Sequence, residues 1–172
     1  MNNVKGIVQQ FKEKFGFEVY DQLPPFLRSL LSTDGTVTDL LEAYYSVGIE
    51  VEKVRAVYYK PGVRVVVLRH GVSKVPLLYA VTKFPNTGLE LAHLFASTDK
   101  PIGRLIDEKK LSTRRIIKDI SFTNPERPDF KHISKVLNLG TRDLFVERTY
   151  SIMTGDDELM EINEIFNVKC YE

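Results

Sequence analysis

The stretch IEVEKVRAVYYKPGVRVVVLRHGVSKVPLLYAVTKF (49–84) decides the fold, because it contains three apolar-rich runs separated by turn-forming residues. The first run, 49–59, alternates branched apolar and polar residues, which is typical of a strand that buries one face. Pro61-Gly62 and the glycine-containing segment HGVSK (70–74) separate the runs, and such residues favour turns. We therefore predict a meander of three antiparallel strands.

Helical periodicity precedes this meander. Apolar residues recur at helical spacing over 4–15 and predict an amphipathic helix. The segment PPFLRSLL (24–31) predicts a second, short helix, because proline suits a first helical turn. A further helix, with Thr36 or Thr38 as its cap candidate, runs to Gly48. We therefore expect three helical pieces before the first strand.

The second half of the chain continues the sheet. Segment 87–95 predicts a short helix, 101–107 a turn or helix, and 112–122 a strand. Two further strand patterns, 143–153 and 157–168, are joined by turn-forming residues and predict a final hairpin. Strand runs with helices grouped outside them indicate an α+β fold, with helices packed on a largely antiparallel single sheet.

The length of 172 residues fits one domain better than two. Hydrophobic residues make up 43% and charged residues 27%, which is ordinary for a globular protein. Segment 122–139 carries two prolines and many polar residues, so we interpret it as an insertion or long connection. We expect a single domain over 1–172 with an insertion at 122–139.

The composition argues against several function classes. Lys and Arg number 24 against 23 Asp and Glu, so no net field favours nucleic acid or an anionic membrane. Cys170 is the single cysteine, and His70, His93 and His132 are scattered, so we predict no disulfide and no metal site. The sequence shows no glycine-rich phosphate loop, Gly-x-Ser-x-Gly elbow or membrane-length apolar run. We expect a cytoplasmic protein and leave its oligomeric state open.

Arg64 and Glu164 are charged residues within apolar strand patterns. An arginine there can bind a carboxylate through two parallel hydrogen bonds, and the alternative is a strand-end side chain in solvent. Glu164 alternates with Ile162 and Phe166 and therefore shares their buried face. Burial would raise the pKa of its carboxyl, whereas Arg64 beside it would lower that pKa. Glu164 is either a functional carboxylate or half of a structural salt bridge.

The order of four local patterns resembles the chorismate pyruvate-lyase family, including the relatives grouped as DUF98. The patterns are SLLSTDGTVTDLLEAY (29–44), RVVVLRHGVSKVPLLYAVTKFP (64–85), KPIGRLI (100–106) and ERTYSIMTGDDELMEINEIF (147–166). KPIGRLI is the most specific of them, because it is similar to the Pro-Leu-Gly-Arg segment of that family. The resemblance runs from about Pro24 to Val168 and implies the chorismate lyase-like fold.

Carried over residue by residue, the resemblance assigns Arg64 to the ring carboxylate of the ligand and Glu164 to the ring 4-hydroxyl. Backbone N–H groups of Val37 and Ile102 would also bind the ligand. The implied reaction cleaves the enolpyruvyl ether of chorismate, removes a ring hydrogen, and yields 4-hydroxybenzoate and pyruvate without a metal or organic cofactor. Glu164 is our candidate for handling the proton. It either removes the proton itself or only orients the 4-hydroxyl, because the departing enolpyruvate could accept that proton.

Further arginines are candidates for the enolpyruvyl carboxylate, with an exposed or structural role as the alternative for each: Arg104, Arg114 and Arg148. The hairpin around His70 is longer than the family form, so Arg69 is an alternative to Arg64. The insertion at 122–139 could cover the pocket, alter the substrate or form a dimer contact.

Two other functions remain open. The effector-binding domains of some bacterial transcription regulators resemble this lyase fold, and they bind small ligands such as an aromatic carboxylate without turning them over. They usually follow a basic helix-turn-helix module, for which the acid-base balance of residues 1–35 leaves little room. A lyase that forms another hydroxybenzoate isomer is the third possibility, because the isomer depends on pocket geometry.

Overall fold

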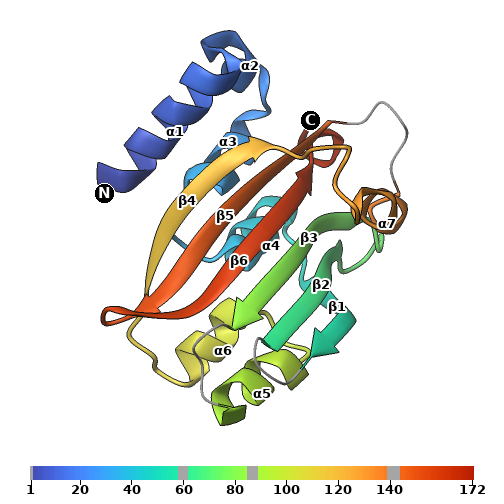
Figure 1. Cartoon of the computed structure of the whole chain (residues 1–172). Coiled ribbons are helices and arrows are strands. Elements are labelled where there is room, and N and C mark those ends of the chain that lie inside the picture. The colour runs from blue at the N-terminus through green and yellow to red at the C-terminus, as the bar shows by residue number, and fades with distance from the viewer. Residues whose placement is uncertain (1, 58–61, 85–88, 139–143) are drawn as a thin grey trace.

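Six antiparallel strands form one sheet in the computed structural model, which describes residues 2–57, 62–84, 89–138 and 144–172 (Figure 1). The strands are β1 (Ile49–Val57), β2 (Gly62–His70), β3 (Pro76–Phe84), β4 (Arg114–Phe122), β5 (Phe145–Thr154) and β6 (Asp157–Asn167). Their order across the sheet is β1-β2-β3-β6-β5-β4. The sheet therefore consists of two three-stranded meanders, which meet where β3 pairs with β6.

The N-terminal meander confirms the prediction made from residues 49–84. β2 pairs with β1 on one side and β3 on the other, both antiparallel. Gly71, in the β2–β3 turn, donates its N–H to the carbonyl oxygen of Gly48 at 3.0 Å. A Cβ at Gly71 would lie 2.3 Å from that oxygen, so this close approach requires glycine. The expected turn at Pro61 lies outside the described residues.

The C-terminal meander contains the predicted final hairpin. β5 and β6 pair up to Thr154 and Asp157, with a register shift between Ile152 and Met153, and Gly155 between the strands has a φ of 59°. This left-handed conformation suits glycine, which explains the position of the turn. β4, also predicted, pairs with the other edge of β5.

The helices largely follow the sequence periodicity. They are α1 (Asn2–Phe15), α2 (Phe17–Gln22), α3 (Pro25–Ser32), α4 (Val37–Tyr45), α5 (Leu89–Ser97), α6 (Ile102–Glu108) and α7 (Phe130–Val136), with a final 3-10 turn at Val168–Tyr171. The expectation of three helical pieces before the first strand was wrong, because α2 is a fourth. Its six residues are too few for apolar periodicity to reveal, and Gly16 separates it from α1 with a φ of 98°. The start of the helix predicted over 87–95 lies outside the described residues.

The two faces of the sheet bury different cores. The inner face, as we call it, carries Val66 and Leu68 and packs against buried residues of α1 to α6. The outer face carries Val65 and Val67 and packs against Ile133 of α7. Successive residues of β2 point to opposite faces, so its nearly continuous apolar run contributes to both cores. The α+β fold with a largely antiparallel single sheet is confirmed.

The segment predicted as an insertion, 122–139, places α7 on the outer face of the sheet, as Figure 1 shows, with residue 139 outside the described residues. Ile133 and Leu137 are 0% and 1% exposed, so this connection contributes its own small core. It lies on the face of the sheet opposite to the site described below. Its status as an insertion stays a prediction.

Candidate active site

A pocket lies between the inner face of the sheet and the first residues of α4 and α6. Its apolar walls come mainly from the strands and include Val51, Val66, Leu68, Leu78, Ala80, Ile152 and Ile162. Its polar side chains include Thr82, Arg64, Arg115, Tyr150 and Glu164. An apolar pocket with a few polar groups is typical of a site for a small molecule.

Arg64 lies on the inner face of β2 and is 1% exposed. One guanidinium nitrogen donates to the carbonyl oxygens of Thr98 at 3.2 Å and Lys100 at 2.8 Å, between α5 and α6. Its Nε is buried and has no partner among the described residues. Burial lowers the pKa of Arg64 to about 10, so the side chain remains a cation at neutral pH. The alternative of a solvent-exposed Arg64 is therefore wrong.

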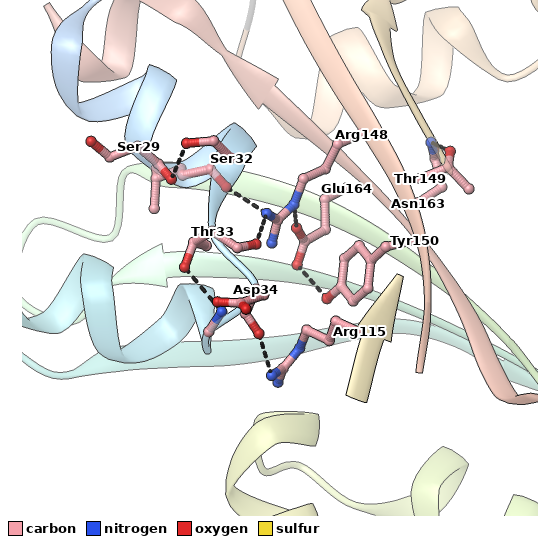
Figure 2. A network of polar contacts seen from close by, with 12 residues as sticks. Ser29, Ser32, Thr33, Asp34, Arg115, Arg148, Thr149, Tyr150, Asn163 and Glu164 are labelled. Carbon is pink, nitrogen blue, oxygen red and sulfur yellow. Dashed lines mark hydrogen bonds and ion pairs between the residues drawn. The ribbon is translucent and has the colours of Figure 1, made fainter. Parts of the chain in front are cut away.

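Glu164 lies on the inner face of β6 and is 5% exposed. Figure 2 shows its two partners: Arg148 donates from Nε to Oε2 at 2.7 Å, and the Tyr150 hydroxyl donates to Oε1 at 3.1 Å. The sequence suggested Arg64 as the neighbouring cation, and that pairing was wrong, because Arg148 on the adjacent strand β5 takes this place. Glu164 therefore belongs to a buried salt bridge and also lines the pocket.

Arg148 and Tyr150 hold the Glu164 carboxylate from two sides. A second Arg148 nitrogen donates to the carbonyl oxygens of Leu30 at 2.5 Å and Thr33 at 2.9 Å, which ties α3 to the sheet. Burial, and then the charge of Glu164, raise the pKa of Tyr150, so its hydroxyl stays protonated and can donate. The carboxylate is thus fixed in position by neighbours that do not depend on a ligand.

Val37 and Ile102 are the first residues of α4 and α6, and both line the pocket. N–H groups in a first helical turn have no acceptor within the helix, so they are available to a ligand. The two helix starts pack closely: a Cβ at Gly103 would lie 2.6 Å from the Thr36 Cγ2 atom. Glycine at 103 therefore lets both helix starts reach one pocket.

The other arginines proposed from the sequence do not line this pocket. Arg69 lies at the surface beside Glu52, and Arg104 pairs with Glu42. Arg114 pairs with Asp156 at 3.3 Å, with its side chain 61% exposed. Arg148, as described, is the partner of Glu164. The interpretation of Arg104, Arg114 and Arg148 as ligands of the enolpyruvyl carboxylate was therefore wrong, because none of the three lines the pocket.

Arg115 and Tyr150 line the pocket but were missed in the sequence. Arg115 donates to the carbonyl oxygen of Asp34 at 2.9 Å, as Figure 2 shows. Alternation would have found both residues, because Arg115 lies two positions before the buried Ile117 and Tyr150 two before the buried Ile152. The same alternation turns Arg114 to the opposite side of β4.

No group of three or more His, Cys, Asp or Glu side chains suited to a metal ion occurs in the described parts of the chain. His70 accepts a hydrogen bond from the Ser73 N–H through Nδ1 at 3.1 Å, which is a local turn contact. Across the described residues, none of the helices combines the length and apolar character needed to span a membrane.

The fold is of the chorismate lyase-like class, and the pocket is of the kind that suits a small molecule. A sequence model of the family described as Chorismate pyruvate-lyase Rv2949c-like matches residues 58–172. The protein named "Putative lyase MJ0807" from Methanocaldococcus jannaschii is 34% identical over 148 residues, which cover 81% of this chain and 77% of that protein. The chain belongs to the Rv2949c-like chorismate pyruvate-lyase family, as the resemblance of the four sequence patterns indicated.

Solved structures share the fold at low sequence identity. PhnF from Mycobacterium smegmatis superimposes with a TM-score of 0.59 and 12% identity, over 78% of this chain and 64% of that one. The effector domain of the same protein gives a TM-score of 0.57 and 14% identity, over 77% of this chain and 88% of the domain. The chain thus spans less than two thirds of the first PhnF chain, and the likeness concerns the fold alone.

Proposed function

We propose that this protein is a chorismate pyruvate-lyase, which converts chorismate to 4-hydroxybenzoate and pyruvate. The observation that carries the proposal is the buried Arg64 guanidinium in the pocket, with Nε unpartnered and no carboxylate within 4.0 Å among the described residues. A buried cation is costly unless it is paired, so a bound carboxylate would complete this site. Family membership and the position of Glu164 in the same pocket support the same reaction.

In this proposal, Arg64 binds the ring carboxylate. Two of its hydrogen bonds, to Thr98 and Lys100, hold one guanidinium nitrogen, and the remaining donors are left for the ligand. The N–H groups at the starts of α4 and α6 add donors for the ligand at Val37 and Ile102. The flat ring then lies between apolar walls such as Val66 and Ile162.

Glu164 orients the ring 4-hydroxyl. Each of its oxygen atoms accepts one hydrogen bond from the protein, and a carboxylate has about four acceptor positions, so it can accept a further one from the substrate. During elimination, the ether C–O bond breaks and its electron pair leaves with the enolpyruvyl oxygen. The ring loses a proton and becomes aromatic, and the enolpyruvate gains a proton on carbon to become pyruvate. Orientation by fixed donors and acceptors lowers the barrier to such a step.

The test is to incubate the purified protein with chorismate and follow the products by chromatography that separates hydroxybenzoate isomers. We expect 4-hydroxybenzoate and pyruvate in equal amounts. Glu164→Gln should lower turnover by about 100-fold or more and change 4-hydroxybenzoate affinity much less. Because the variant also removes the charge that faces Arg148, its fold must be checked by circular dichroism. Tight 4-hydroxybenzoate binding without turnover would contradict the proposal and favour a ligand-binding domain.

A further inference from the structure

Arg115 is the second arginine of the pocket, and the roles proposed above leave it without a function. It lies on β4, donates to the carbonyl oxygen of Asp34, and its Nε is buried without a partner among the described residues. Its neighbour Arg114 points to the other side and pairs with Asp156. The two adjacent arginines therefore have different surroundings, one in the pocket and one in solvent.

The charges in the pocket do not balance without a ligand. Glu164 is the acidic residue among the described lining side chains, and Arg148 already pairs with it. Among the described residues, no carboxylate lies within 4.0 Å of the guanidinium of Arg64 or Arg115. Two cations in the pocket are thus left to be neutralised, which matches a ligand with two carboxylates.

The two arginines that line the pocket come from strands that are far apart in the sheet. Arg64 is on β2 and Arg115 on β4, four strand positions apart in the order β2-β3-β6-β5-β4. At about 4.8 Å per strand, their backbones are separated by roughly 19 Å along a flat sheet, and both long side chains line the same pocket. They are therefore placed for two separate carboxylates on one ligand rather than for a single carboxylate.

We propose that Arg115 binds the enolpyruvyl carboxylate of the substrate, the group that leaves as pyruvate. This inference rests on the proposed lyase function. Chorismate carries one carboxylate on the ring and one on the enolpyruvyl group, and each product keeps one of them. Arg115 therefore contacts the half of the substrate that 4-hydroxybenzoate lacks. As the ether bond breaks, negative charge develops on the enolpyruvyl oxygen next to this carboxylate, and a nearby guanidinium stabilises that charge.

The proposed role of Arg115 predicts different effects on the binding of chorismate and of 4-hydroxybenzoate. Arg64 contributes to the binding of chorismate and of 4-hydroxybenzoate, whereas Arg115 contributes to chorismate alone. A purely structural role for Arg115, through its bond to Asp34 near the start of α4, would affect both ligands alike. The difference between the two ligands therefore separates substrate contact from structural support.

The experiment compares Arg115→Gln, Arg115→Lys and Arg114→Gln with the unchanged protein. For each, kcat/KM for chorismate is measured by product chromatography, and the Kd for 4-hydroxybenzoate by calorimetry. We expect Arg115→Gln to lower kcat/KM about 10- to 100-fold and to change the Kd less than about threefold. Arg115→Lys should recover part of the loss because it keeps the charge. Arg114→Gln, the matched control on the same strand, should change neither quantity.

Equal losses for both ligands in Arg115→Gln, or no loss for chorismate, would overturn the assignment. If Arg115→Gln does not fold, as judged by circular dichroism, Arg115→Lys replaces it, and we then expect a smaller loss for chorismate with the Kd for 4-hydroxybenzoate still nearly unchanged. If the unchanged protein binds chorismate without turnover, the proposed function fails, and the Kd for chorismate replaces kcat/KM. A loss confined to chorismate would then still support Arg115 as the contact of the second carboxylate.

Discussion

Charged side chains on the two faces of the sheet differ in their exposure to solvent and in their ion-pair partners. On the outer face, Arg127 contacts both Asp129 and Glu147, and these side chains are 17% to 45% exposed. On the inner face, the Arg148–Glu164 pair is 1% and 6% exposed, and Arg64 has only carbonyl partners. The outer face thus satisfies its charges within the chain and partly by water. The inner face buries more cations than it pairs.

This difference distinguishes charged side chains that are paired within the chain from charged side chains that a ligand can pair with. Exposed ion pairs contribute little to stability, because water already solvates the separated ions. Buried ions need partners, and a buried cation without a carboxylate partner marks a place where a ligand can contribute that partner. The comparison therefore predicts large effects of substitutions on the inner face and small ones on the outer face.

The largest effect is expected for Arg148→Ala. It would leave Glu164 buried without its cation and free the carbonyl groups of Leu30 and Thr33, at a cost of about 3–5 kcal/mol in the free energy of unfolding. The matched change on the outer face, Arg127→Ala, should cost at most about 1 kcal/mol. Urea unfolding of both variants measures the two values. Similar values for the two would remove the distinction between the faces.

Arg64→Ala should weaken the binding of 4-hydroxybenzoate about 10- to 100-fold, because it removes a charged donor that faces the carboxylate. Arg69→Ala, on the same strand but at the surface, serves as the control and should leave the affinity unchanged. Calorimetry gives both dissociation constants. An unchanged affinity in Arg64→Ala would show that this arginine is structural.

Gly103→Ala tests the close packing of the two helix starts. The added methyl group would meet the Thr36 side chain, so we expect a loss of about 1 kcal/mol in unfolding free energy and a several-fold weaker 4-hydroxybenzoate affinity. Gly6→Ala in α1 is the control, because a Cβ there meets nothing within 4 Å. That change should stabilise the helix slightly. Thermal unfolding and calorimetry distinguish the two variants.

The smallest effect on stability is expected from the protonation of Asp129, which lies on the outer face. The hydrogen bond from Arg127 lowers the pKa of Asp129, so this contribution to stability is present at neutral pH and is lost as pH falls through the lowered pKa. The carboxylate is partly exposed, so the contribution is small. Asp129→Asn should therefore be slightly less stable at pH 7, and the gap should narrow toward about pH 3. Urea unfolding at both pH values checks this; a gap that widens in acid would contradict it.

Much of the fold could be predicted from the sequence because its strands alternate with a clear period. The meander over 49–84 and the hairpin that contains Glu164 were both found in this way. α2 was missed, because six residues give too little periodicity. The strand order, with β6 beside β3, could not be read from local pattern, since it depends on contacts between distant segments.

The site could be predicted only in part, for a related reason. Arg64 stood out because it opens an apolar strand, and Glu164 because it alternates with the apolar Ile162 and Phe166. The partner of Glu164 depends on which strand lies next to β6, and local sequence does not encode this. Arg115 was missed because it is adjacent to Arg114 in the sequence. Which of these two arginines faces the pocket depends on which face of the strand each one occupies.

The joining of the two meanders at β3 and β6 also has a consequence for folding. Each meander pairs strands that are consecutive in the chain, whereas the β3–β6 pairing joins segments about 80 residues apart, such as Thr82 and Ile162. Long-range pairings of this kind carry the larger loop-closure entropy and tend to form late. Arg64 belongs to the first meander and Glu164 and Arg115 to the second, so the pocket exists only after this joining. A ligand that contacts both halves therefore binds only the joined state and, at about 100 times its Kd, would stabilise it by roughly 2.7 kcal/mol.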